Sequence, residues 1–96
     1  MTTINIKQTA DKITFKNDRR TEAVITHVHC DNIIWRGDDQ YRVPEYYDVY
    51  MPMGRGHGVR AKYMISEWCD MIKRTCDYCA GIGETVYKGL AAIRPF

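Results

Sequence analysis

The sequence predicts an α+β fold: an antiparallel β-sheet of four to six strands with one amphipathic helix, at about residues 59–75, packed on one face. Apolar and polar residues alternate in several short runs of the first half of the chain, which is typical of half-buried strands. Clusters of Gly, Asp and Asn separate these runs and favour turns. A later stretch carries apolar residues at helical spacing, and 96 residues suit a single domain, residues 1–96.

The first element expected is a β-hairpin, because apolar residues alternate on both sides of a polar segment, residues 9–11. The alternating apolar residues are Ile4, Ile6, Ile13 and Phe15. A polar, charged loop over residues 16–22 should follow this hairpin.

A second hairpin is expected over residues 23–36, which are rich in β-branched side chains. Asp31 and Asn32 tolerate left-handed backbone conformations and would form its turn. In this hairpin His27 pairs with Arg36 on the more polar face.

A long strand over residues 41–51 is expected next, after a turn at residues 37–39. Pro44 has no amide hydrogen to donate to a neighbouring strand, so this strand should lie at an edge of the sheet or contain a bulge. The glycine-rich residues 54–58 then predict a flexible loop.

The amphipathic helix should begin after this loop and contact the sheet through its apolar face. The residues expected at that contact are Met64, Ile65, Trp68 and Ile72. Asp70 and Arg74 are one helical turn apart and should form an ion pair. Beyond the helix, residues 85–87 favour a strand, and residues 90–93 fit either a short strand or a helical turn.

The long strand is the first candidate for a binding surface, because it carries tyrosines on the face that cannot enter the core. Tyrosine and arginine dominate protein interfaces, and both also stack on nucleotide bases. The alternative is that these tyrosines are ordinary aromatic residues of a sheet under a helix or second layer. The candidate residues are Arg42, Tyr46, Asp48 and Tyr50.

The glycine-rich loop and the start of the expected helix form the second candidate, because basic or potentially basic side chains gather there. They are Arg55, His57, Arg60 and Lys62. Positive charge in a first helical turn opposes the helix dipole, and a bound anion would compensate for that cost. The alternative is a simple connector, since no Gly-Lys-Ser/Thr sequence of a phosphate-binding loop closes it.

Cys76 and Cys79 form a CxxC motif, and residues 76–83 read CxxCxGxG. This octet resembles a single copy of the cysteine-rich repeat of DnaJ-type co-chaperones, and the resemblance implies a zinc knuckle. A structural zinc needs four ligands, and the other two would come from Cys30, Cys69 or the histidines. The alternative is that the thiols are reduced and structural, as is usual in a reducing compartment.

His27 and His29 would share one face of a strand, where they could ligate a metal or act as a base. Solvated histidines on a polar face are the simpler interpretation. No catalytic triad spacing, HExxH motif or carboxylate pair stands out, so we do not expect an enzyme. A small enzyme using a histidine base is the third hypothesis for function.

The net charge of +2 conceals an uneven distribution along the chain. Residues 36–50 have a net charge of 2 − 4 = −2, and residues 54–74 one of 5 − 2 = +3. An electrically two-sided surface is therefore expected, unlike the basic stripe of a duplex-binding protein. No apolar run of signal-peptide or membrane-spanning length is present, so we expect a cytoplasmic protein with no membrane partner.

These patterns favour a small non-catalytic interaction protein. A protein or ribonucleoprotein complex is the expected partner, bound through the Tyr/Arg-rich edge strand and the Gly/Arg loop. Such small proteins are often accessory factors of phages and mobile elements, so the expected class is an inhibitor of a host defence or nucleic-acid-processing complex, of the anti-CRISPR or anti-restriction type. The alternative is a zinc-knuckle nucleic-acid-binding protein, with zinc as its cofactor.

Overall fold

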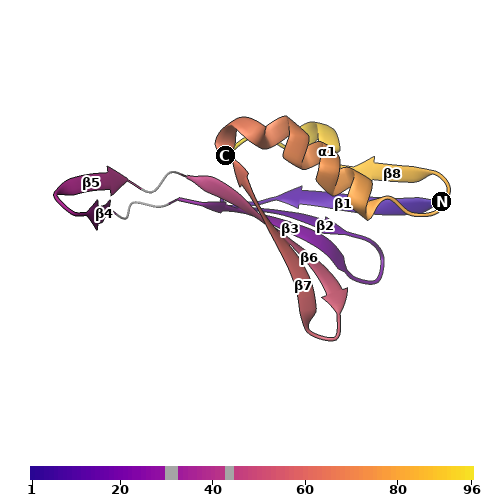
Figure 1. Ribbon diagram of the computed structural model, residues 1–96. Helices are drawn as coiled ribbons and strands as arrows, with labels where there is room; N and C mark the ends of the chain where they lie inside the picture. The colour runs from indigo at the N-terminus through magenta and orange to yellow at the C-terminus, as the bar shows by residue number, and fades with distance from the viewer. Residues whose placement is uncertain (30–32, 43–44) are drawn as a thin grey trace.

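The structure, a computed structural model, describes residues 1–29, 33–42 and 45–96, and of residues 33, 34 and 42 only the backbone. In this part of the chain a six-stranded sheet has the order β7-β6-β3-β2-β1-β8 (Figure 1). Neighbouring strands are antiparallel except β1 and β8, which are parallel. The bounds are β1 (Thr2–Gln8), β2 (Lys12–Lys16), β3 (Thr21–Val28), β6 (Tyr46–Gly54), β7 (His57–Met64) and β8 (Thr85–Lys88).

A helix covers one face of this sheet, which confirms the predicted α+β fold class. A single 3-10 turn, η1 (Ile65–Glu67), leads into α1 (Trp68–Cys79). The buried residues of α1 are Met71, Thr75 and Cys79, which follow one another at intervals of four. Met71 and Cys79 pack with buried residues of the strands and of the carboxyl-terminal segment, namely Ile4, Ile6, Ile13, Phe15, Ala23, Ile25, Tyr47, Val49 and Ile93.

The helix begins later than predicted, because residues 57–64 form the strand β7. The apolar residues of this segment fit the spacing of a strand as well as that of a helix. Ala61 pairs with Val49 on β6, and Tyr63 pairs with Tyr47, so alternate residues of β7 extend the apolar face of the sheet. Only the residues from Ile65 onward follow the helical spacing.

The start of the helix is marked by a side chain that the sequence reading overlooked. The carboxylate of Glu67 accepts a hydrogen bond of 2.8 Å from the amide of Met64, which has extended backbone and precedes η1. The predicted pair of Asp70 and Arg74 is confirmed, with 3.2 Å between Oδ2 and Nε. Of the four residues expected to contact the sheet, Trp68 and Ile72 pack against the core, whereas Met64 and Ile65 are exposed.

The predicted flexible loop at residues 54–58 is a tight turn between two strands. Gly54, Arg55 and Gly56 have φ angles of 83°, 53° and 75°, and the paired strands continue directly on either side. Glycine adopts such left-handed conformations without steric cost, which explains the repeated glycines without a ligand.

The predicted hairpin over residues 23–36 is wrong in its pairing. His27 lies opposite Tyr47 of β6, whereas Arg36 lies opposite Asp39. The strands β4 (Ile33–Arg36) and β5 (Asp39–Arg42) form a two-stranded sheet of their own, which Figure 1 shows apart from the main sheet. The eight residues of β3 find a partner of matching length in the nine residues of β6, whereas β4 offers only four. The expected turn at residues 31–32 lies outside the described residues.

The predicted strand over residues 41–51 is divided between β5 and β6, which belong to different sheets. β6 is not an edge strand, because β3 and β7 flank it. Pro44 lies outside the described residues, and the pairing of β6 with β3 runs from Tyr46 to Tyr50.

The amino-terminal hairpin is confirmed as β1 and β2, and the charged loop after it is shorter than expected, since β2 includes Lys16 and β3 begins at Thr21. The carboxyl-terminal segment forms β8 and the 3-10 turn η2 (Leu90–Ala92). Gly89 connects them with a φ of 94°, and a Cβ there would lie 2.4 Å from the carbonyl oxygen of Ile6. A side chain at this position is therefore excluded by both conformation and space.

Candidate binding surface

The face of the sheet opposite α1, here called the uncovered face, carries most of the cations of the strands. Successive strand residues point to opposite faces, so residues between the buried positions lie on the uncovered face. The charged residues placed there by the strand pairings are Lys7, Lys12, Lys16, Arg60, Lys62 and Lys88, with Asp48 as the acid. Their sum is 6 − 1 = +5, whereas the whole chain has a charge of +2. The uncovered face is thus strongly basic.

The cations spread across the sheet instead of gathering at one point. The strand pairings place Lys7, Thr14, Val24, Tyr50 and Arg60 side by side in one line across five strands. Since adjacent strands lie about 4.8 Å apart, this line spans roughly 19 Å. An elongated anion matches this distribution better than a small one.

Two tyrosines lie between these cations. The guanidinium carbon of Arg60 is 4.6 Å from the centre of the Tyr50 ring, and the ammonium of Lys62 is 4.4 Å from that of Tyr46. Arg60 also donates a hydrogen bond of 2.6 Å to Asp48. Cation–π contacts of this kind hold ring and cation next to one another.

The close approach of Tyr50 to β7 depends on Gly58. A Cβ on Gly58 would lie 2.4 Å from Cε2 of the tyrosine ring, so the ring lies directly against the glycine backbone. Glycine thereby serves a packing purpose here, since its φ is not in the left-handed region.

Five of the eight predicted binding residues thus meet on the uncovered face: Tyr46, Asp48, Tyr50, Arg60 and Lys62. Arg55 lies in the tight turn, and His57 begins β7 beside it. Arg42 belongs to β5 in the smaller sheet, where the structure describes its backbone alone.

The predicted anion site at a helix amino terminus is wrong, because Arg60 and Lys62 lie in the middle of β7. Neither cation opposes a helix dipole there.

The acidic segment of residues 36–50 does not form an acidic surface. Asp38 and Asp39 belong to the β4–β5 hairpin, Glu45 contacts histidines at the end of the main sheet, and Asp48 pairs with Arg60. The prediction of separate acidic and basic surfaces from the charge count along the chain is therefore wrong, and the uncovered face is basic.

A hollow of about 680 Å³ opens beside the uncovered face at β1, β2 and the loop that follows. Its lining includes Asn5, Lys7, Thr14, Lys16 and residues 17–21. The sequence reading did not single out these lysines, although they occupy the polar positions of the alternating amino-terminal hairpin.

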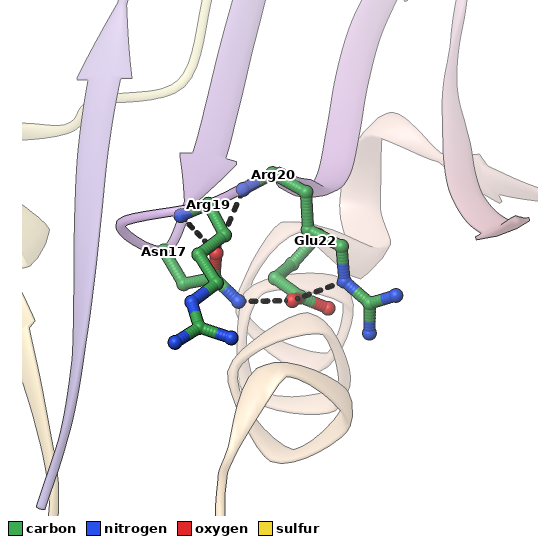
Figure 2. A network of polar contacts seen from close by, with 4 residues as sticks. All are labelled: Asn17, Arg19, Arg20 and Glu22. Atoms are coloured by element: carbon green, nitrogen blue, oxygen red, sulfur yellow. Dashed lines mark hydrogen bonds and ion pairs between the residues drawn. The ribbon is translucent and has the colours of Figure 1, made fainter.

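A polar network holds the loop at this hollow in one conformation (Figure 2). Oδ1 of Asn17 accepts hydrogen bonds of 2.8 Å from the amides of Arg19 and Arg20, and its Nδ2 donates to Glu22. Glu22 also accepts a bond of 3.0 Å from Nε of Arg20, which raises the pKa of that guanidinium. The charge of Glu22 also contributes to raising the pKa of Cys79 in α1.

The CxxC cysteines lie in the last turns of α1, where the backbone is helical. Burial raises the pKa of Cys79 to about 12, with smaller contributions from Glu22 and Cys76, and burial also raises the pKa of Cys76. Both thiols are therefore protonated at neutral pH. Among the described residues no group of three candidate metal ligands includes them.

The histidines that the sequence reading left as solvated side chains meet Glu45 at the end of β3. Nε2 of His27 lies 2.9 Å from Oε2 of Glu45, and Nδ1 of His29 lies 3.1 Å from Oε1. The hydrogen bond from His27 lowers the pKa of Glu45. Burial, and to a smaller extent the charge of Glu45, raises the pKa of Tyr47.

No helix in the described part of the chain is long and apolar enough to cross a membrane. Comparisons of the chain with models of protein families, with curated proteins and with solved structures found no match.

Proposed function

We propose that this protein is a non-catalytic binding protein whose uncovered face holds an extended single-stranded nucleic acid. The observation that carries the proposal is the net charge of +5 on one sheet face that also presents Tyr46 and Tyr50. Proteins that bind single strands combine a cationic surface along the phosphates with aromatic rings on which bases stack.

The shape of the surface favours a single strand over a duplex. Double-stranded DNA is read mainly by an element that enters the major groove, and the uncovered face presents strands side by side. A single strand can lie along this line of roughly 19 Å, with phosphates at Lys7 and Arg60 at its two ends and a base at Tyr50. Nucleic acid, the alternative partner in the sequence reading, is thereby favoured.

The expected protein or ribonucleoprotein partner has its own support in the β4–β5 hairpin. Trp35 and Tyr41 are 64% and 50% exposed on this small separate sheet. Tryptophan and tyrosine contribute disproportionately to protein interfaces, so the hairpin is the second candidate surface. Inhibition of a host defence or nucleic-acid-processing complex stays a prediction, and the double variant Trp35→Ala/Tyr41→Ala should lose such a partner while keeping oligonucleotide binding.

The proposal is tested by fluorescence anisotropy with labelled oligo(dT) and oligo(U) of roughly 12 nucleotides, a length typical of such sites. The double variant Tyr46→Ala/Tyr50→Ala should bind at least about tenfold more weakly, because each stacked base contributes roughly 1–3 kcal/mol. Tyr78→Ala is the matched control, since Tyr78 is an exposed tyrosine of α1. Circular dichroism confirms that each variant is folded.

The proposal fails if the wild-type protein does not bind these oligonucleotides, or if the variant without both tyrosines binds them with the same affinity. Tighter binding to a duplex of the same sequence than to the single strand also contradicts it. Removal of Tyr78 should leave the affinity unchanged.

A further inference from the structure

Three side chains with metal-binding donors converge where β3 and β6 reach the end of the main sheet. One donor atom from each of His27, His29 and Glu45 lies within 4.8 Å of the others. The carboxylate bridges the imidazoles, with oxygen–nitrogen distances of 2.9 Å to His27 and 3.1 Å to His29. This cluster lies on the helix side of the sheet, so it is separate from the uncovered face.

The strand pairing explains why these residues meet. His27 lies opposite Tyr47 and Val28 opposite Tyr46 in the antiparallel pair β3–β6. Continuing this register by one residue places His29 opposite Glu45. Because alternate residues share a face, the two histidines and the carboxylate all project to the same side.

Aromatic rings hold the inner part of the cluster. The ring of Phe96 stacks on that of His27, with 5.2 Å between centroids and an angle of 4°. The ring of Tyr47 lies 5.9 Å from that of His27, and Trp68 packs against both Tyr47 and Phe96. His27 is therefore fixed in orientation, which reduces the entropy lost when it binds a ligand.

The outer part of the cluster is open to solvent. The side chain of His27 is only 17% exposed, whereas those of Glu45 and His29 are 43% and 56% exposed. An ion can thus approach from the solvent while its innermost ligand is already positioned.

A buried hydroxyl beside the cluster fits a coordinated water. Tyr47 is fully buried, and its hydroxyl has no hydrogen-bond partner among the described residues. A buried polar group without a hydrogen-bond partner destabilises the folded state. A water molecule on an ion at the cluster would donate a hydrogen bond to this hydroxyl oxygen.

We propose that His27, His29 and Glu45 bind a divalent transition metal, with zinc as the expected ion and an open fourth position for water. Imidazole donors favour Zn²⁺ over Mg²⁺ and Ca²⁺, which prefer oxygen ligands. Tetrahedral zinc has bonds of about 2.0–2.2 Å to nitrogen and oxygen, which separates its ligand atoms by roughly 3.3 Å. The two oxygen–nitrogen distances need to lengthen by a few tenths of an ångström, and the two imidazole nitrogens, which lie within 4.8 Å of one another, need to reach the same spacing.

Binding would replace the protons that the imidazoles share with Glu45. The ring nitrogen that faces Glu45 loses its proton and gives its lone pair to the ion, while the other ring nitrogen of each histidine carries the N–H. A charged imidazolium releases one proton to solvent in this step, a neutral imidazole changes its tautomer, and the carboxylate binds the metal in place of the histidines. No oxidation or reduction is involved.

The test measures zinc binding by metal-free protein with native mass spectrometry and isothermal titration calorimetry, using ZnCl₂. We expect roughly one zinc per chain, the stoichiometry of a mononuclear site. His29→Ala and Glu45→Gln should each weaken binding by at least about tenfold. His57→Ala is the matched control, since this exposed histidine of β7 lies outside the cluster.

A second measurement separates this site from the cysteines. Co²⁺ bound by nitrogen and oxygen should lack the near-ultraviolet charge-transfer absorption of cobalt–thiolate bonds, and Cys76→Ala/Cys79→Ala should bind zinc as the wild type does. The proposal is overturned if the wild type takes up no zinc, or if H29A and E45Q bind zinc as tightly as the wild type does. It is also overturned if H57A loses as much zinc affinity as H29A and E45Q. Loss of zinc in the cysteine variant alone would assign the ion to α1. Unfolding curves without metal show whether H29A and E45Q remain folded.

Discussion

Replacing Lys7 and Lys16 by glutamine should reduce nucleic-acid binding in a way that depends on salt. Both ammonium groups line the hollow beside the uncovered face, and neither forms an ion pair within the described part of the chain. For single strands, log K falls with log salt by about 0.7 for each phosphate contact. If each lysine contacts one phosphate, the slope of the double variant should be shallower by about 1.4.

The same relation sets the loss of affinity. At about 0.1 M salt each contact contributes roughly 0.7 to log K, so the double variant should bind about 25-fold more weakly. Near 1 M salt the two proteins should bind equally, because counterion release then contributes nothing.

Anisotropy titrations with labelled oligo(dT) at several salt concentrations measure both quantities. Lys73→Gln removes a cation from the exposed side of α1 and should leave slope and affinity unchanged. The assignment of phosphates to the uncovered face would be refuted if the double variant had the same salt slope as the wild type. It would also be refuted if the Lys73 variant lost as much affinity as the double variant.

Three further predictions concern stability and thiol chemistry. Gly89→Ala should lower the free energy of unfolding by roughly 1–3 kcal/mol more than Gly83→Ala in urea titrations, because both glycines have positive φ but only Gly89 faces the carbonyl of Ile6. The free energy of unfolding should fall as pH rises from about 9 to about 12, since the Cys79 thiol ionises in the unfolded chain before it does in the folded one; Cys79→Ala should flatten this fall, and an unchanged profile would contradict the raised pKa. Peptide mapping after brief iodoacetamide treatment should find Cys69, which is exposed, modified well before Cys79, and equal labelling would contradict the burial of Cys79.

The fold class could be predicted from the sequence because alternation and helical spacing are local signals. The apolar alternation of β1 and β2 and the helical spacing from Trp68 onward report directly on burial. The start of the helix could not be predicted from local spacing. Alternate apolar residues of β7 also fall on positions compatible with a helical face, and only pairing with β6 decides between them.

The arrangement of the candidate surfaces depended on long-range pairing, which local patterns do not contain. A turn signal at residues 31–32 suggested that His27 faces Arg36, whereas β3 pairs with β6 and brings Glu45 to the histidines. The +5 charge of the uncovered face arises from residues on five strands, so a count along the chain could not reveal it. The tyrosine-bearing face of β6 was predicted from alternation alone, because that signal is local.

The parallel pair β1–β8 has a consequence for the order in which the chain can fold. Thr2 pairs with Thr85, a separation of 85 − 2 = 83 residues, so β1 leaves the ribosome long before the strand that pairs with one of its edges. Contacts between residues so distant in sequence form slowly. Until β8 pairs with β1, β1 presents an unpaired strand edge to other chains. The main sheet can therefore be completed only after residues 85–88 have emerged, and the growing chain is most exposed to aggregation during synthesis.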